Sequence, residues 1–152
     1  NVLGWSQHKK SLINVQCFNG LDGLHHVISH CDIVVVLLPL TEETRQLLNR
    51  DLFLKMKQGA AIINFARGNI VNQNDLVTAL DEKMLSHAVL DVFAQEPLPI
   101  KDELWQHPNI TVLPHISAPT NPKTACEIVK KNIECYVLTG KIPKSVDVKK
   151  GY

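Results

Sequence analysis

Short apolar runs that end in a polar residue restrict the fold of this chain more than any other feature. The runs span residues 60–66, 88–92 and 110–114, and the polar residues that follow them are Arg67, Glu96 and His115. In an open parallel sheet the carboxyl ends of the strands face the ligand crevice, and right-handed crossovers bring those ends to one edge. We therefore expect a cation, a carboxylate and an imidazole to form a site for a small anion.

Each of these polar residues also has a simpler interpretation. Arg67 alone is typical of a solvated turn, and Glu96 next to Pro97 can simply end a strand. His115 can be an ordinary half-buried histidine, because this residue type is often found partly inside. The expected convergence of all three on one edge is what favours a site.

The composition is that of an ordinary globular protein. Hydrophobic residues make up 45% and charged residues 20% of the 152 residues, so the chain should bury a core. The net charge of +1 gives no reason to expect a nucleic acid or an anionic membrane as a partner. The longest apolar run, residues 33–38, is too short to cross a bilayer.

The cysteines and histidines do not predict a metal site. The four cysteines are Cys17, Cys31, Cys126 and Cys135. Their spacing matches neither a zinc site nor a disulfide framework, so we expect reduced thiols in a cytoplasmic protein. His25 and His26 lie close to Cys31, but two adjacent imidazoles on a helix point in different directions. We interpret this segment as a partly exposed helix and expect no metal.

Strands alternate with helices along the chain, which predicts an α/β fold with a parallel sheet. Strands are expected at residues 2–5, 32–38, 60–66, 88–92 and 110–113, and helices over 21–28, from 41, over 52–59, over 74–80 and over 121–139. The run 32–38 is typical of a parallel strand that is buried on both faces. Asn74 or Asp75 is the expected cap of its helix.

The last helix has the clearest ends. Asn121 precedes it, Pro122 stands in its first turn where a missing N–H costs nothing, and Gly140 stops it. We expect a Rossmann-like, doubly wound parallel sheet that is incomplete at its amino end. Residues 1–120 would form a partial nucleotide-binding domain, and residues 121–152 a C-terminal return helix and tail.

Four ordered motifs resemble the D-2-hydroxyacid dehydrogenase family. They are LLPLT at 37–41, INFARGNIV at 63–71, AVLDVFAQEPLP at 88–99 and VLPHISAPT at 112–120. The ending VDVKKGY, residues 146–152, and the pair Trp5 and Ser6 are similar to the glyoxylate/hydroxypyruvate reductase branch. The resemblance implies an oxidoreductase that interconverts 2-keto and 2-hydroxy acids with a nicotinamide cofactor, and a homodimer.

The resemblance also implies roles for the three polar residues. Arg67 would hold the substrate carboxylate, because a guanidinium offers two parallel donors to its two oxygens. Glu96 would hydrogen-bond His115, and a nearby negative charge favours the imidazolium. His115 would then protonate the carbonyl oxygen as hydride arrives at carbon, or act as the base in the reverse direction.

The cofactor residues follow from the same resemblance. Asp91 is similar to the residue that orients the nicotinamide carboxamide, and the residues implied to lie along the cofactor cleft are Leu38, Pro39, Ala66, Ser117 and Ala118. In this fold an acid after the second strand binds the ribose of NAD, whereas basic residues there accept the 2′-phosphate of NADP. Trp5 and Ser6 are followed by Lys9 and Lys10, and no acid occurs before Asp22. NADPH is therefore favoured over NAD.

The glycine-rich phosphate loop of this fold, G-x-G-x-x-G, does not occur in these residues. Pyrophosphate binding depends on that loop, so we expect this polypeptide alone to be inactive although its parent protein is an enzyme. The choice between glyoxylate, hydroxypyruvate and a bulkier 2-keto acid stays open. A non-catalytic NAD(P)-binding sensor or scaffold is the alternative function, since a fold does not determine a function. A formate dehydrogenase is a further alternative, but it pairs its histidine with glutamine, which Glu96 argues against.

Overall fold

A computed structural model describes residues 1–143 of the chain. Its elements are β1 (Leu3–Trp5), β2 (Gln16–Phe18), α1 (Gly20–His30), β3 (Ile33–Val36), α2 (Arg50–Phe53), β4 (Ala60–Asn64), η1 (Gly68–Ile70), α3 (Gln73–Asp81), β5 (Leu85–Leu90), η2 (Glu103–Trp105), β6 (Ile110–Val112) and α4 (Pro122–Thr139). The chain divides into one compact unit, Asn1–Pro114, and a second that begins at His115. Among the described helices, none combines the length and apolar character that a membrane span requires.

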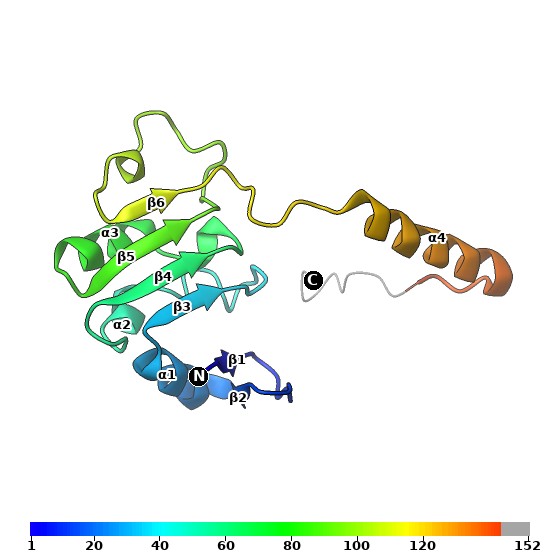
Figure 1. Ribbon diagram of the computed structural model, residues 1–152, viewed down its shortest axis with the longest axis horizontal. Helices are drawn as coiled ribbons and strands as arrows, with labels where there is room; N and C mark the ends of the chain where they lie inside the picture. The colour runs from blue at the N-terminus through cyan, green and yellow to red at the C-terminus, as the bar shows by residue number, and fades with distance from the viewer. Residues whose placement is uncertain (144–152) are drawn as a thin grey trace. The chain divides into compact units, whose positions relative to one another are not determined.

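The first unit is an α/β fold built on parallel strands (Figure 1). One sheet pairs β1 with β2, and a four-stranded sheet has the order β3-β4-β5-β6. Every strand pair within these two sheets is parallel. Strand–helix alternation with consecutive parallel strands side by side is the Rossmann-like arrangement that the sequence predicts.

The carboxyl ends of the four strands lie level with one another. Val36 pairs with Asn64, Asn64 with Leu90, and Leu90 with Val112. These are the last residues of β3, β4, β5 and β6. The loops after the four strands therefore all start from one row at one edge of the sheet.

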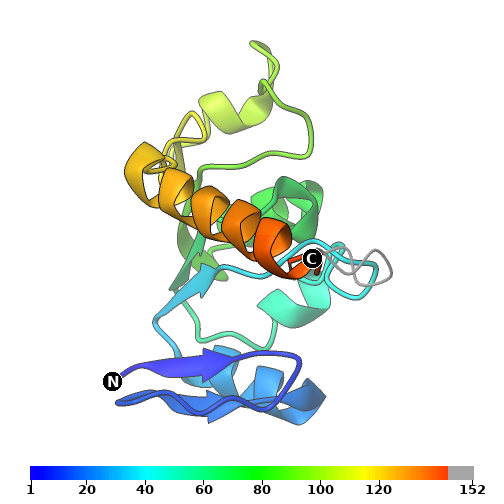
Figure 2. The same ribbon diagram turned by 90° about the vertical axis from the view of Figure 1, so that its right-hand side faces the viewer.

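One face of this sheet is buried more deeply than the other. Ile62 of β4 and Ala88 of β5 have no exposed surface and belong to the core, which helices α2 and α3 close on one side of the sheet (Figure 2). On β3, Ile33 is 57% and Val35 is 48% exposed, whereas Val36 is buried. The expectation that this strand is buried on both faces is therefore wrong, because the described helices cover only the face on which Val36 lies.

The helix expected to begin at Thr41 does not form. Residues 42–46 make turns, in which the Arg45 N–H donates to the Thr41 carbonyl over 2.9 Å. Gln46 then takes a left-handed backbone with φ of 51°, and its N–H donates to the Asn69 carbonyl. The single turn cannot continue, since L-residues do not propagate a helix from that conformation.

Two details of the expected elements need correction. The cap of α3 is Asn72, whose side chain accepts a hydrogen bond from the Asp75 N–H, and not Asn74 or Asp75. On α1, Leu24, Val27 and Ile28 are buried as their spacing predicts, but Leu21 is 65% exposed in the first turn. The strand β2 was not predicted at all, because its three residues carry no apolar repeat.

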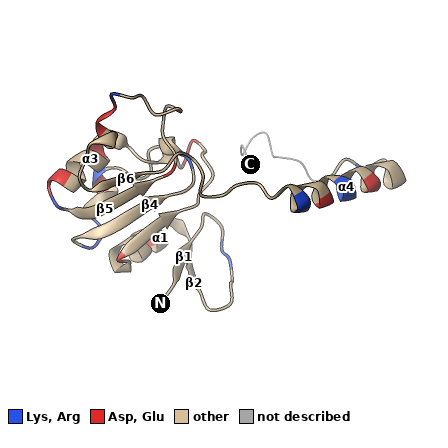
Figure 3. Cartoon of the chain, turned by 45° about the horizontal axis from the view of Figure 1, so that its top comes forward, with Lys and Arg blue, Asp and Glu red and all other residues tan. Residues whose placement is uncertain are grey.

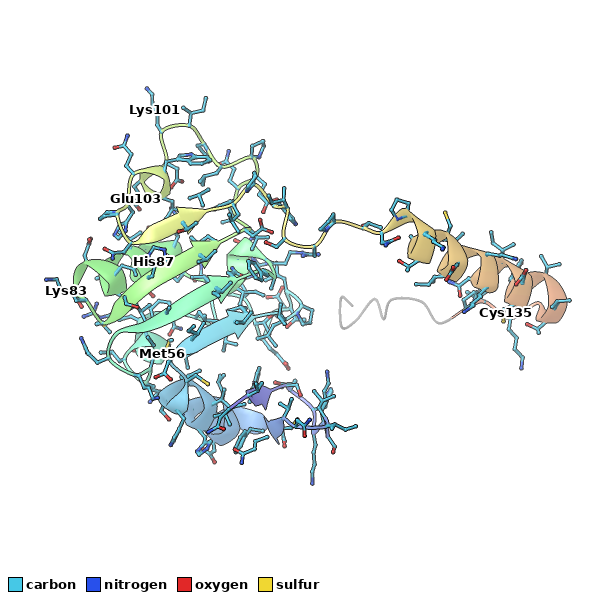
Figure 4. All side chains as sticks on the ribbon, in the orientation of Figure 1. Met56, Lys83, His87, Lys101, Glu103 and Cys135 are labelled. Carbon is cyan, nitrogen blue, oxygen red and sulfur yellow. The ribbon has the colours of Figure 1, made fainter. Side chains whose placement is uncertain are left out.

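Side chains also link neighbouring strands on the less buried face. His87, which Figure 4 labels, lies on β5. Its Nε2 is 2.9 Å from the Oγ1 of Thr111 on β6. This cross-strand hydrogen bond helps to hold β6, the last strand of the sheet, against β5.

Helix α4 forms in the second unit with the ends that the sequence predicts. The Asn121 side chain accepts hydrogen bonds from the N–H groups of Lys123 and Thr124, and Gly140 ends the helix with φ of 65°. No residue of α4 is buried, and charged residues alternate in sign along it, with Lys130 and Glu134 3.7 Å apart (Figure 3). The motif at 146–152 lies outside the described residues.

Candidate active site

The loop after β4 is held by the side chain of Asn64. This residue is 1% exposed, and its Nδ2 donates to the Arg67 carbonyl while its Oδ1 accepts from the Ala66 N–H, both over 3.0 Å. A buried amide left without partners would cost about 1–3 kcal/mol, so both hydrogen bonds favour this one loop shape. Asn64 thereby determines where the backbone of Arg67 lies.

Arg67 presents an exposed guanidinium at this edge. Its Nη1 donates to the Ala66 carbonyl over 2.6 Å, which ties the tip of the side chain back to its own loop. A guanidinium has five N–H donors, so most of them stay available to a ligand. This supply of donors suits a carboxylate.

The Arg67 loop packs directly against the loop after β5. A Cβ atom built on Gly68 would lie 1.9 Å from the Phe93 carbonyl carbon and 2.3 Å from the Ala94 nitrogen. No side chain fits in that space, so only glycine allows this contact. The loop that carries Arg67 and the one that leads to Glu96 are therefore in contact at Gly68.

The Glu96 carboxylate is anchored to its own loop. Its Oε1 accepts a hydrogen bond from the Phe93 N–H over 2.9 Å. Asp91 lies just before this loop, is 2% exposed, and donates its N–H to the Asn64 carbonyl over 3.1 Å. The β4 and β5 loops are thus linked near their origin as well as at Gly68.

His115 is the first residue of the second unit. Its backbone is left-handed with φ of 56°, which is uncommon for a residue with a Cβ atom. Ser117 and Ala118 follow in the same unit and are exposed. The structure therefore brings the loops of Arg67 and Glu96 together within the first unit, while His115 belongs to the second.

The residues expected to bind the adenosine end of the cofactor lie around the end of β1. The Trp5 Nε1 donates to the Gly20 carbonyl over 2.8 Å, and the Ser6 hydroxyl donates to the His8 carbonyl over 2.8 Å. Lys9 and Lys10 are exposed, and no ion pair of the residues 1–143 involves either of them. This turn thus offers two solvated cations.

Some of the residues expected along the cofactor cleft belong to the first unit, and they lie at the carboxyl edge of the four-stranded sheet. Leu38 is half-buried and Pro39 exposed just after β3, and Ala66 is buried just after β4. Sequence reasoning missed Asn64 and Gly68. Asn64 could have been found, because it is a polar residue at the end of an apolar run. Nothing in the sequence near Gly68 indicates its close contact with the loop after β5. Within the described part of the chain, no group of three or more metal-binding side chains is suitable for a metal ion.

Comparisons with known proteins agree with this architecture. Parallel strands with loops gathered at their carboxyl edge define an α/β nucleotide-binding domain, and residues 1–117 match the family model of the D-isomer specific 2-hydroxyacid dehydrogenase NAD binding domain. The chain therefore belongs to the D-isomer specific 2-hydroxyacid dehydrogenase family.

Solved structures of the family are similar over nearly the whole chain. A D-isomer specific 2-hydroxyacid dehydrogenase from Xanthobacter autotrophicus Py2, in complex with NADPH and MES, is 40% identical with a TM-score of 0.93 over 99% of this chain and 62% of its own. An NADPH-dependent glyoxylate/hydroxypyruvate reductase from Sinorhizobium meliloti, in complex with NADP and sulfate, is 32% identical with a TM-score of 0.91 over 99% of this chain and 49% of its own. The chain thus spans about half of one of these relatives and less than two thirds of the other.

Proposed function

We propose that the protein to which this chain belongs reduces glyoxylate, hydroxypyruvate or a similar 2-keto acid to the 2-hydroxy acid with NADPH. The observation that carries the proposal is the contact at Gly68, which holds the Arg67 loop against the loop that leads to Glu96. An exposed guanidinium, on a loop that contacts the loop leading to an anchored carboxylate, suits a substrate that carries both a carboxylate and a carbonyl group. The similarity to the Sinorhizobium meliloti reductase favours the small substrates.

In this proposal Arg67 binds the substrate carboxylate. Two of its N–H groups pair with both oxygens, which determines the orientation of the adjacent keto carbon. The Asn64 hydrogen bonds support this role, since they hold the backbone of Arg67 in one conformation before the substrate arrives.

His115 is the proposed acid. Glu96 would orient its imidazole and favour the protonated form. His115 would then give its proton to the carbonyl oxygen as the carbonyl carbon is reduced, and would take it back in the oxidation direction. NADPH, when bound, supplies the hydride.

The preference for NADPH over NADH is a further part of the proposal. Lys9 and Lys10 form a solvated pair of cations after β1, where a 2′-phosphate would lie in this fold. Proposed cofactor contacts also come from Trp5, Ser6 and Asp91, and from the cleft residues already described. The presence of NADPH or NADP in the two similar structures supports this preference.

We also propose that the 152-residue chain alone has no turnover. The sequence holds no G-x-G-x-x-G loop for the pyrophosphate, and the similar dehydrogenases are considerably longer. The whole protein is proposed to be a cytoplasmic homodimer, which light scattering and cell fractionation would test.

A chimera tests the catalytic proposal. Residues 1–152 replace the matching segment of the Sinorhizobium meliloti reductase, and NADPH oxidation is followed with glyoxylate and with hydroxypyruvate. The chimera should turn over, and His115→Ala should lower kcat by about 10²–10⁴-fold. His25→Ala on α1 is the matched control and should leave kcat unchanged. NADPH binding without turnover in the chimera would instead favour a sensor.

A further inference from the structure

The exposed side of α1 carries a stack of two imidazoles that the proposed reaction does not use. His26 and His30 lie one helical turn apart, with ring centroids 4.2 Å apart and ring planes 27° apart. The Phe18 ring lies 4.6 Å from the His26 ring and limits its movement. Both histidines are exposed, so the stack faces solvent.

The hydrogen bonds around His30 determine which ring nitrogen carries a proton. The His30 Nδ1 lies 2.7 Å from the His26 carbonyl oxygen. A carbonyl oxygen only accepts, so the Nδ1 must be the donor. The Ser29 hydroxyl agrees with this, because it donates to the same carbonyl over 3.0 Å and leaves its oxygen to accept from Nδ1, also 3.0 Å away.

With the proton on Nδ1, the neutral ring carries its lone pair on Nε2. No hydrogen bond within residues 1–143 involves the His30 Nε2. A metal-binding histidine commonly donates its other ring N–H to a backbone carbonyl, which fixes the ring orientation. His30 has this arrangement before any ion is bound.

The spacing of the pair also suits a shared ion. Two histidines at i and i+4 lie on one face of a helix and can bind one metal ion together. The adjacent pair His25 and His26 considered in the sequence cannot do so, because neighbouring positions diverge on a helix. Asp22 lies one turn before His26 and adds negative charge to the same face of α1.

We propose that His26 and His30 bind a borderline divalent transition-metal ion, such as Ni²⁺ or Zn²⁺, with water in the other positions. Imidazole suits both of these ions. The site takes two protein ligands, since no set of three suitable side chains occurs in the part of the chain that the structure describes. The bound ion would link the last two turns of α1 to each other.

Calorimetry with Ni²⁺ on the untagged 152-residue chain tests the proposal. We expect one site, and His26→Ala or His30→Ala should each weaken binding by about 10-fold or more, because losing a ligand should cost at least as much as losing a group that only orients one. The double variant should lose detectable Ni²⁺ binding, since it removes both imidazoles of the chelate. His25→Ala is the matched control and should bind like the unaltered chain.

Nuclear magnetic resonance gives a second readout that locates the ion. Paramagnetic Ni²⁺ should first broaden the amide signals at the carboxyl end of α1. If an alanine variant loses its helix by circular dichroism, His26→Gln and His30→Gln replace the alanine variants. The proposal would be overturned if His25→Ala and His26→Ala lost Ni²⁺ affinity equally, or if the double variant still bound Ni²⁺.

Discussion

Gly68 lies so close to Phe93 that a Cβ atom on the glycine would fall 1.9 Å from the phenylalanine carbonyl carbon. The neighbouring atoms are backbone and not the flexible end of a side chain, so they cannot simply move aside. This contact connects two loops that originate on different strands, and it makes the spacing of the proposed substrate-binding groups depend on a residue that has no side chain.

Gly68→Ala should therefore destabilise the first unit. Overpacking of this kind costs about 1–3 kcal/mol, and the cost here should lie at the upper end, because the backbone of a whole loop has to shift. Urea denaturation measures the change. Asn69→Ala is the control, since the Asn69 side chain makes no hydrogen bond within residues 1–143, and equal losses of stability in both variants would contradict the role of the contact.

Asn64→Ala should also lower stability, by about 1–3 kcal/mol, because the Ala66 N–H and the Arg67 carbonyl lose their partner. In the chimera, the same change should raise KM for glyoxylate more than it lowers kcat, since it disturbs the residue that positions Arg67. Steady-state kinetics and denaturation on the same preparations separate the two effects. A change in stability with KM unaltered would mean that Asn64 is purely structural.

Arg67→Lys in the chimera tests the carboxylate contact. Lysine keeps the charge but loses the planar pair of donors. A charge-assisted hydrogen bond contributes about 1.5–3 kcal/mol, so kcat/KM should fall roughly 10- to 150-fold. Arg45→Lys is the matched control in the turn after β3, and a comparable loss there would argue against a specific role for Arg67.

The pKa of the Asp32 carboxyl is expected to depend on one lysine, Lys57. The Lys57 ammonium lies 2.8 Å from the Asp32 Oδ1, and its hydrogen bond and charge lower the pKa of that carboxyl below its ordinary value. A lowered pKa contributes stability above the unfolded pKa, and this contribution is lost as the pH falls through the folded value. Carbon NMR titration should show a higher pKa for Asp32 in Lys57→Met than in Lys55→Met, and both pKa values being equal would contradict the pairing.

The uncovered face of β3 should promote self-association. Ile33 and Val35 are both about half exposed there, and an apolar strand at the edge of a sheet invites pairing with other chains. Val35→Lys should lower the apparent mass of the chain in sedimentation at high protein concentration. Lys substitution of Leu54, which is 61% exposed on another element, serves as the control. Unchanged association in Val35→Lys would show that other surfaces are responsible.

Much of the fold could be predicted because its signals are local. Helix α4 has an Asn121 cap, a proline in its first turn and a terminal glycine, and each of these acts within a few residues of the helix end that it marks. The strands β4, β5 and β6 are apolar runs between turns, although β5 begins earlier than predicted, at Leu85. The turn at Gln46 could not be predicted, because it depends on a hydrogen bond to Asn69 that is distant in sequence.

The candidate site, like the fold, has parts that the sequence predicts and parts that it does not. Arg67 and Glu96 were predicted to follow strands of one sheet, and the level ends of β4 and β5 explain why their loops meet. The exposure of Ile33 was not predictable, since an apolar run does not say which face the helices will cover. The contact at Gly68 depends on two loops that approach only after the sheet has formed, and no pattern in the sequence near residue 68 indicates it.

The row formed by Val36, Asn64, Leu90 and Val112 has a consequence for protein engineering. Because the four strands end at one height, the loops beyond that row start from matched positions, but the loops after β4 and β5 have to be exchanged together because they are in contact at Gly68. A deletion of one residue inside β4 is a different matter, since it would turn Asn64 to the opposite side of the sheet and leave the guanidinium without its support. Libraries that vary this chain should therefore diversify beyond the row, keep Gly68, and keep the strand lengths constant.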